Sequence, residues 1–459
     1  MAITILVIGL LIFLGHVLTA LFQRTKVPDV LVLMVAGMLL GPVFGVVSPA
    51  DLGKVGQVFT TVALVVILFE GGIHLNLRQL AAAAGGALAI TVATSAVTLL
   101  LLAHLADFLL PLEFPGALLV GVLLCGTSAS VVVPLIRSLG LTGRAGTILF
   151  LESALTDVLV IVLTLGFLQA FLAFYQGSGA TLAAGTLAWQ VVRAFLLAAL
   201  IGTGGALFWS AVLERIRRFP DTVFTTLAYV FILYGITELA GYSGAIAALA
   251  FGVTLANVPL IPTRAGRLFR VRLTPFAEHE RAFFSETVFV VKTFFFVLLG
   301  VSTTFTDLRV VLAGLVLAVA AFAARAPVIR LLGSPDLSRR EAALMTALVP
   351  KGLAPAVLAG LPAQLGLPGS EPIQGAAYAT IFFSIAGCAV LVFAVERGLL
   401  APVLATWFRK FPIEPPAPPP APPGPAPAPE EGLPALARLP SSYLTDLQEP
   451  NALTDLDRP

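Results

Sequence analysis

The sequence predicts an all-α polytopic membrane protein with about thirteen transmembrane helices, and three observations support this fold class. Hydrophobic residues make up 58% of the 459-residue chain and charged residues 11%, which is too much apolar surface for a water-soluble domain. Apolar runs of about 20 residues, the length that crosses a bilayer, recur along the chain. The basic residues fall mainly in alternate loops. Lipid is therefore the expected solvent for most of the chain.

The apolar runs can be placed in order from the N-terminus. The first starts at residue 2 with no basic segment before it, so we expect a transmembrane helix rather than a cleaved signal peptide. The ninth is the weakest, because it is short and rich in Gly and Ala. The thirteen predicted helices cover roughly 2–22, 28–47, 54–72, 80–105, 114–138, 146–174, 185–213, 221–240, 243–260, 283–304, 308–333, 341–366 and 374–407.

The loop charges test this map. With the N-terminus outside, the external loops carry only Lys54 and Arg309, and the other loop arginines and lysines are cytoplasmic. One miscounted helix would destroy this positive-inside bias. We therefore expect a multi-pass protein of the plasma membrane (the inner membrane of a bacterium), with an external N-terminus and a cytoplasmic C-terminus. The cytoplasmic loops and tail carry Arg24, Lys26, Arg78, Arg137, Arg144, Arg215, Arg217, Arg218, Arg264, Arg267, Arg270, Arg272, Arg281, Arg330, Arg339, Arg340, Arg409 and Lys410.

The segment 409–459 differs in composition from the membrane domain, 1–408. Its stretch PPAPPPAPPGPAPAPEEG lacks the apolar side chains that a core needs, which predicts a disordered cytoplasmic tail, with a Pro-rich docking site as the alternative. The net charge of +2 is spread over many loops and gives no reason to expect a nucleic-acid partner. No GxGxxG fingerprint follows a strand, and the two cysteines have no metal-binding spacing, so we expect neither nucleotide nor cofactor, only membrane lipid.

The sixth predicted helix carries the most informative charges within the membrane. It reads LFLESALTDVLVIV, and Asp157 lies about two turns inside it, on the same helix face as Ser153. A lone carboxylate at this depth costs several kcal/mol unless it is protonated, paired or binding a cation. A group that chooses between a proton and a metal ion is what an exchanger needs. The alternative is a structural ion pair with Lys292 or Arg325.

Other ionisable residues within the membrane are few. Glu152 shares a stripe with Thr156 and lies about 140° around the helix from Asp157, so we expect it to face other partners in a structural role. The remaining intramembrane charges are Glu70, Arg193, Glu286, Lys292, Arg325 and Lys351.

Two of the predicted helices are interrupted in mid-span. The fifth contains CGTSASVVVP, and the twelfth contains TALVPKGLAPAV. Proline removes a backbone donor and glycine loosens the helix, and irregular backbone at this depth is tolerated only where it lines a cavity or is buried in protein. Segments seven helices apart cross the membrane in opposite senses, as inverted repeats with a midplane ion site require. The alternative is a pair of ordinary proline kinks.

At these residues the chain resembles the monovalent cation:proton antiporter superfamily, and within it the sodium/proton exchanger, NhaP-like branch, over about residues 1–408. The resemblance implies the sodium/proton antiporter fold, with inverted repeats, crossed broken helices 5 and 12, and a core domain that moves against a dimerisation domain of a homodimer to give alternating access. Its segments are LFEGGI (68–73), TSASVVVPLIRSLGL (127–141), ESALTD (152–157), SGAIAALAFGVTLAN (243–257) and FFFVLLG (294–300).

The resemblance also implies roles for single residues. Asp157 would alternately bind cation and proton, and the metal ion would take further oxygen ligands from Ser153, Glu70 and the Thr127 carbonyl. Glu152 would pair with Arg325 on helix 11.

Lys292 and Lys351 would be further structural or coupling charges. Lys292 stands where part of the superfamily keeps a basic residue on helix 10.

Two positions depart from the family pattern. Thr156 replaces the usual Asn or Asp before the key carboxylate, and Ser128 replaces an Asp that often follows the Thr of the helix 5 break. A single carboxylate at Asp157 suggests one proton per cation and electroneutral exchange, whereas Lys292 is a candidate second titrating group. Thr156 and Ser128 remain candidate residues of the ion-binding and proton-coupling site, and as weaker ligands they leave potassium open as an alternative to sodium.

The favoured function is exchange of a monovalent cation, sodium first, for protons. A K⁺/H⁺ antiporter or a cation channel of the same superfamily is the alternative, although few polar residues outside the two breaks could line a channel. An enzyme such as an intramembrane hydrolase is not expected, because no nucleophile motif is present. A transporter of organic anions on a related fold would have no need for Asp157.

Overall fold

The computed structural model describes residues 2–25, 27–47, 49–74, 77, 86–141, 143–175, 184–217, 223–260, 278–303 and 307–413. Within these ranges the chain is helical and has no β-strand. It divides into two units, Met1–Ile413 and Glu414–Pro459. The second unit holds most of the predicted tail and lies outside the described residues, so the tail stays a prediction.

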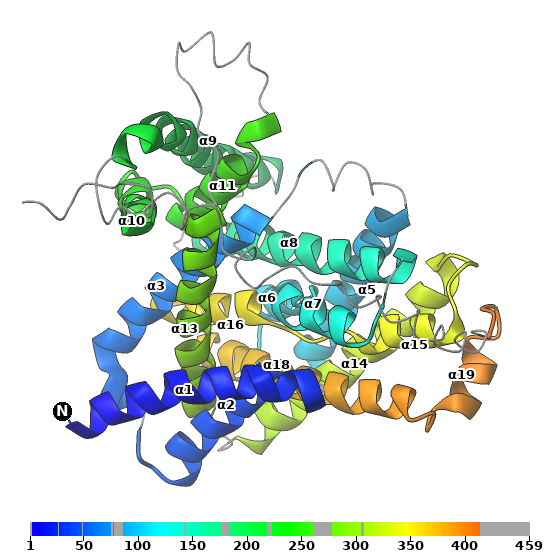
Figure 1. The fold of residues 1–459 in the computed structure, drawn as a ribbon. Coiled ribbons are helices and arrows are strands. Elements are labelled where there is room, and N and C mark those ends of the chain that lie inside the picture. The colour runs from blue at the N-terminus through cyan, green and yellow to red at the C-terminus, as the bar shows by residue number, and fades with distance from the viewer. Residues whose placement is uncertain are drawn as a thin grey trace, which may run out of the picture. The chain divides into compact units, whose positions relative to one another are not determined.

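The described helices follow the predicted order (Figure 1). Among the described residues, seven helical segments are long and apolar enough to cross a membrane, and six shorter apolar helices occupy the other six predicted runs. The helices are α1 (Ala2–Thr25), α2 (Asp29–Met38, continued by the π-helical turn Leu39–Val43), α3 (Pro49–His74), α5 (Gly86–Leu109), α6 (Phe114–Leu124), α7 (Ala129–Ser138), α8 (Gly143–Tyr175), α9 (Ala184–Ile216), α10 (Val223–Leu239), α11 (Gly244–Ala256), α13 (Glu278–Ser302), α14 (Leu308–Leu332), α15 (Arg339–Ala347), α16 (Leu353–Leu358), α17 (Leu361–Gln364), α18 (Ser370–Glu396) and α19 (Ala401–Trp407).

The last predicted run, 374–407, is wrong as a single helix. Helix α18 ends at Glu396, and Gly398 then adopts a positive φ of 69°, which reverses the chain before α19 begins. Glycine takes this left-handed conformation at little cost. The apolar residues on both sides of the turn hid it from a hydropathy argument.

Both predicted interruptions are present as breaks between helices. Helix 5 is divided into α6 and α7, with Ser128 extended at φ −83° and ψ 116° as the N-cap of α7. Helix 12 is divided into α15 and α16, with Gly352 extended as the N-cap of α16. Pro355 falls in the first turn of α16, where its missing N–H would have no helical acceptor, so it favours a helix start there.

The inter-helix contacts fall into two groups. Helices α5, α6, α7, α8, α14, α15, α16 and α18 contact one another, and we call them the crossover bundle. Helices α1, α2, α3, α9, α10, α11 and α13 form the second bundle. Contacts between the bundles include α3 with α8 and α16, α2 with α18, and α8 with α9. The predicted roles of a mobile core and a dimerisation domain remain predictions.

Glycines bring helix backbones of the second bundle into direct contact. A methyl group on Gly37 of α2 would overlap the Val297 carbonyl of α13, and one on Gly252 of α11 would overlap the Phe69 carbonyl of α3. Small residues permit such close approach in membranes. The α3–α11 contact therefore fixes the position of α3 one residue before Glu70.

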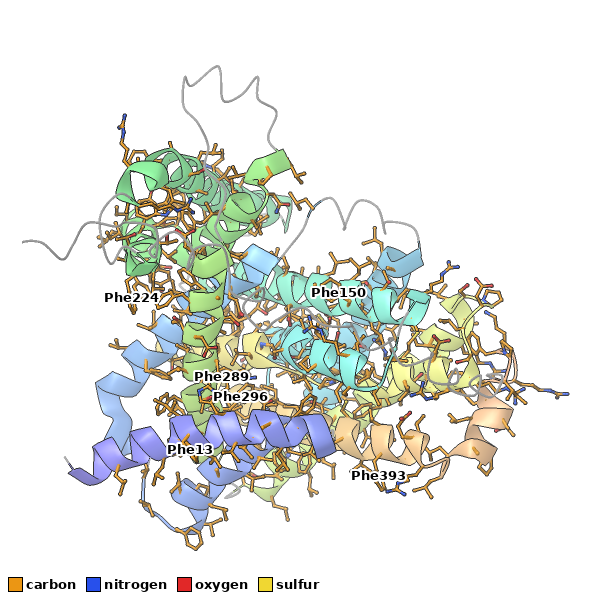
Figure 2. All side chains as sticks on the ribbon, in the orientation of Figure 1. Phe13, Phe150, Phe224, Phe289, Phe296 and Phe393 are labelled. Carbon is orange, nitrogen blue, oxygen red and sulfur yellow. The ribbon has the colours of Figure 1, made fainter. Side chains whose placement is uncertain are left out.

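Many large apolar side chains point away from the protein. Figure 2 labels Phe13, Phe224 and Phe393, which are exposed, whereas Phe296 is fully buried between helices. Exposed phenylalanine and leucine along otherwise apolar helices are expected where lipid is the surrounding solvent. The chain is a multi-pass membrane protein.

Candidate ion-binding site

The two helix breaks contact each other directly. The Ser128 N–H donates to the Pro350 carbonyl at 2.8 Å, and the Lys351 ammonium donates to the Gly126 carbonyl at 2.8 Å. Each bond joins the extended segment of one broken helix to that of the other. Backbone groups that would be unsatisfied in the membrane are paired here, as the bilayer interior demands.

The helix ends at this crossing carry opposite partial charges. The C-terminal end of α6 is partly negative and meets the buried Lys351 ammonium at Gly126. The N-terminal end of α7 is partly positive, and its Ala129 N–H donates to the Asp157 carboxylate at 3.1 Å. The crossing thus holds one cation and one carboxylate against the helix ends that suit them.

Asp157 lies on α8, a helix of the crossover bundle that also contacts α3 of the second bundle. It is half-buried on α8, and the charge of Glu70 on α3 acts on it repulsively. A second negative charge disfavours the ionised form of a carboxylate, and a positive charge beside it favours that form. A proton or a metal ion would relieve this repulsion, and the two would compete for the carboxylate.

Hydrogen bonds of the Thr156 side chain connect α8 to the helix 5 break. Its hydroxyl accepts from the Thr127 N–H at 3.0 Å and donates to the Thr127 carbonyl at 3.1 Å. The Thr127 carbonyl, expected from the resemblance as an ion ligand, thus already receives one proton, and one lone pair remains for a cation. The Thr156 hydroxyl thus connects α8 to the helix 5 break, next to Asp157 in the sequence.

The two serines of the predicted site differ in their surroundings. Ser153 is fully buried, and its hydroxyl donates to the Phe150 carbonyl of its own helix at 3.0 Å, which leaves its oxygen lone pairs available. The Ser128 hydroxyl lies 2.9 Å from that of Ser130. Position 128 thus offers a hydroxyl group, not a carboxylate, to the crossing.

Glu152 faces away from the ion site and contacts Arg325. The pair is bidentate, with one N–H···O bond of 2.7 Å, and Arg325 also donates to the Met345 carbonyl. The exposed fractions of Glu152 and Arg325 are 1% and 0%. Lys351 is close enough to interact electrostatically with both. This cluster joins α8, α14 and α15 inside the crossover bundle.

Lys292 is not brought to Asp157 by any contact in the described part of the chain. Its ammonium forms an ion pair of 3.1 Å with Asp29, the first residue of α2. Asp29 was not expected from the sequence to be a partner of Lys292. It follows Pro28 at the edge of an apolar run and resembles an ordinary loop charge. Its position at a helix N-terminus, where acids are favoured, was the available signal.

Gly352 leaves space that the Ser128 side chain fills. A Cβ at position 352 would overlap both the hydroxyl oxygen and the Cβ of Ser128. We expect Gly352→Ala to force the two breaks apart, to lower stability by about 1–3 kcal/mol as overpacking does, and to reduce transport sharply. Thermal unfolding in detergent and initial uptake rates measure the two effects.

Gly360→Ala is the matched control, since its nearest neighbours lie 3.5 Å or more from the added carbon. Adding Ser128→Gly to Gly352→Ala removes most of the overlap and should restore part of the loss. Equal behaviour of Gly352→Ala and Gly360→Ala would contradict the close crossing.

The geometry can be compared with known proteins. The chain is 25% identical over 397 residues to the K⁺/H⁺ antiporter NhaP2 of Shewanella oneidensis, covering 85% of this chain and 64% of that protein. It is 27% identical over 273 residues to sodium/hydrogen exchanger 7 of Arabidopsis thaliana, covering 55% and 23%. The chain thus spans 64% of the length of the NhaP2 antiporter that it matches.

The fold is similar to a solved structure, the sodium proton antiporter MjNhaP1 from Methanocaldococcus jannaschii at pH 8. The TM-score is 0.65 with 20% sequence identity, over 88% of this chain and 98% of that one. This likeness establishes the antiporter fold. The family described as "Sodium/hydrogen exchanger, transmembrane" matches residues 9–397. The chain therefore belongs to the sodium/hydrogen exchanger family.

Proposed function

We propose that the protein is a secondary active antiporter that exchanges a monovalent cation for protons by alternating access. The observation that carries this proposal is the position of Asp157, held by the N-terminal end of α7 at the crossing of two broken helices and facing the charge of Glu70. Family membership and the names of the antiporters that the chain resembles support it.

The coupling follows from competition for one positive charge. Because the charge of Glu70 on α3 acts repulsively on the Asp157 carboxylate, the site is more stable when it holds a proton or a cation than when it holds neither. Movement of the loaded crossover bundle against the second bundle would carry that charge to the other face. The empty site, with the Asp157 carboxylate ionised, would be costly to move, which links the two fluxes in opposite directions.

We favour sodium as the cation, with Asp157, Ser153, Glu70 and the Thr127 carbonyl as oxygen ligands. Potassium is the second candidate. The sodium/hydrogen exchanger family supports the first, and the relatives named K⁺/H⁺ antiporters support the second.

The test is relief of an imposed pH gradient in proteoliposomes after addition of sodium, lithium or potassium. Antiport predicts that one of these cations collapses the gradient, and that every cation movement is accompanied by proton movement in the opposite direction. A cation flux that persists without opposite proton movement would identify a channel instead. Failure of all three cations would contradict the proposal.

We further expect one proton per cation, so that exchange is electroneutral. Lys292 already pairs with Asp29 in the second bundle, so it does not serve Asp157 as a second titrating group in this conformation. Initial exchange rates should then stay the same, within about twofold, when valinomycin and potassium gradients set the membrane potential to zero or to negative values. This assay applies if sodium is the substrate, and a different ionophore is needed if potassium is.

Asp29→Asn supplies an informative comparison, because it removes the carboxylate partner of Lys292 and leaves the Asp157 site intact. A change to voltage-sensitive exchange in this variant would support the view that the ion pair keeps Lys292 out of the transport cycle. Voltage-sensitive exchange in the unmodified protein would contradict electroneutrality.

We also propose a homodimer with an external N-terminus and a cytoplasmic C-terminus. Both cysteines of the chain, Cys125 and Cys388, are buried, so a single cysteine introduced in the tail can be labelled selectively. Labelling by an impermeant maleimide only after the cells are opened would support the orientation. Cross-linking across a two-fold axis in intact membranes tests the dimer.

A further inference from the structure

Four basic residues gather at one end of the crossover bundle and take no part in the proposed exchange. Arg330 lies in the last turn of α14, Arg397 follows α18 directly, and Arg409 and Lys410 follow α19. All four side chains are exposed. We call these four residues, together with Trp407, the basic end patch.

Two kinds of contact hold the patch together. The Arg330 guanidinium lies 5.1 Å from the centre of the Trp407 ring, and the Lys410 ammonium lies 3.2–3.4 Å from three carbonyls at the end of α14. Phe408 and Phe411 are buried beside them and anchor the segment. The chain that follows α19 is therefore seated on the end of α14, which brings Arg330, Trp407 and Lys410 together. Arg397 and Arg409 directly follow α18 and α19.

The charges of the patch are not neutralised by acids in the described ranges. The neighbouring Glu396 forms an ion pair with Arg340 instead, at 2.9 Å. No ion pair within those ranges involves Arg330, Arg397 or Arg409. Four positive charges that have no acidic partner in this part of the structure attract an anion.

Exposed apolar side chains lie at the same helix ends as the basic residues, and they indicate what kind of anion would bind there. Leu331, Leu399 and Trp407 have exposed fractions of 74%, 65% and 42%. Helices α14 and α18 are both long enough to span a bilayer, so their ends lie where hydrocarbon meets the headgroups. Basic residues mixed with tryptophan and leucine at this depth are typical of an interface with anionic lipid. A site for free phosphate would gain nothing from the exposed leucines.

We propose that the basic end patch binds the headgroup of an anionic phospholipid in the adjoining leaflet. Arg330 and Arg397 contact its phosphate, and Trp407 lies against its glycerol and upper acyl chain. The site is independent of the exchange at Asp157. The competing occupant is the chain's own segment 414–459, which carries seven acidic residues and two basic ones: Glu414, Glu430, Glu431, Asp446, Glu449, Asp455 and Asp457 against Arg438 and Arg458.

The test titrates the full-length protein in neutral detergent with phosphatidylglycerol or phosphatidylcholine and counts bound lipids by native mass spectrometry. Arg330→Gln and Arg397→Gln should each weaken phosphatidylglycerol binding about fivefold, and the double variant should weaken it further. Arg215→Gln, an exposed arginine in the last turn of α9, is the matched control and should bind as the unmodified protein does. Lys410 is left intact because it caps α14.

Three results would overturn the proposal. The double variant could bind phosphatidylglycerol as tightly as the unmodified protein. Inorganic phosphate at millimolar concentration could displace the lipid completely, which would identify a site for free anions. Deletion of residues 415–459 could raise the affinity for phosphatidylglycerol severalfold, which would make the tail the resident occupant. Unchanged affinity after the deletion supports the lipid.

Discussion

Replacing Asp157 with Asn is expected to abolish cation-coupled proton movement while the protein still folds. The amide has nearly the same shape as the carboxylate, and its oxygen can still accept from the Ala129 N–H that now lies 3.1 Å from Asp157. It can neither bind a proton in the working range nor give full charge to a cation ligand. The competition that couples the two fluxes would disappear, and the exchange rate should fall to that of empty vesicles.

The measurement is cation-driven collapse of a pH gradient in proteoliposomes, with thermal unfolding measured in parallel. Asp107→Asn is a suitable control, because Asp107 is an exposed carboxylate near the end of α5. Retained exchange in Asp157→Asn would remove this residue from the mechanism. If unfolding temperature falls with activity, the carboxylate has a structural role as well.

Replacing Arg325 with Ala is expected to produce the largest loss of stability. The side chain is fully buried, and its removal leaves the Glu152 carboxylate, also buried, without its bidentate partner. Breaking one side of a buried ion pair typically costs about 3–5 kcal/mol. We expect a lower yield and a lower unfolding temperature, with little change in apparent cation affinity for the protein that remains folded.

The chain offers both a control and a rescue for this prediction. Arg309→Ala lies on the same helix, but Arg309 is exposed, so its loss should change stability little. Glu152→Gln combined with Arg325→Met removes both charges at once and should recover much of the lost stability, because neither charge of the pair is left without the other. A stable Arg325→Ala protein would show that Glu152 finds another partner, of which the nearby Lys351 is the first candidate.

The helical framework could be predicted because lipid imposes a simple rule on sequence. Spanning segments must be about 20 residues long and apolar, and this rule located runs that are helical in the structure, from α1 to α18. It failed at 374–407, where the turn at Gly398 is flanked by apolar residues on both sides. Hydropathy predicts whether a residue lies in lipid or in water, and it does not show where the chain turns.

The break positions could also be predicted, because proline, glycine and small polar residues weaken a helix that an apolar run would otherwise form without interruption. The atoms that meet at the crossing could not be predicted. The bonds from Ser128 to Pro350 and from Lys351 to Gly126 join residues more than 200 positions apart. They depend on how two helices are rotated, which no local pattern specifies.

The ion pair of Lys292 with Asp29 illustrates the same limit for charges. From sequence, Lys292 was a candidate partner for Asp157 because both lie deep in apolar helices. The structure gives it a partner at the start of α2, where a short acidic side chain looked unremarkable. A long lysine side chain can reach a carboxylate on any of several neighbouring helices, so its depth alone does not select one.

The glycine contacts of the second bundle have a consequence for how this protein can diverge. Gly37 against Gly300, and Gly72 against Gly252, place backbone on backbone with no side chain between them. A mutation at any of these four positions would shift a whole helix. Replacement of a lipid-facing leucine by another apolar residue changes almost nothing. Natural variants should therefore keep these four glycines while the outward faces of the same helices drift. Slow sequence change at these glycines, which do not bind the ion, would then reflect the close packing of the helices and not the chemistry of ion binding.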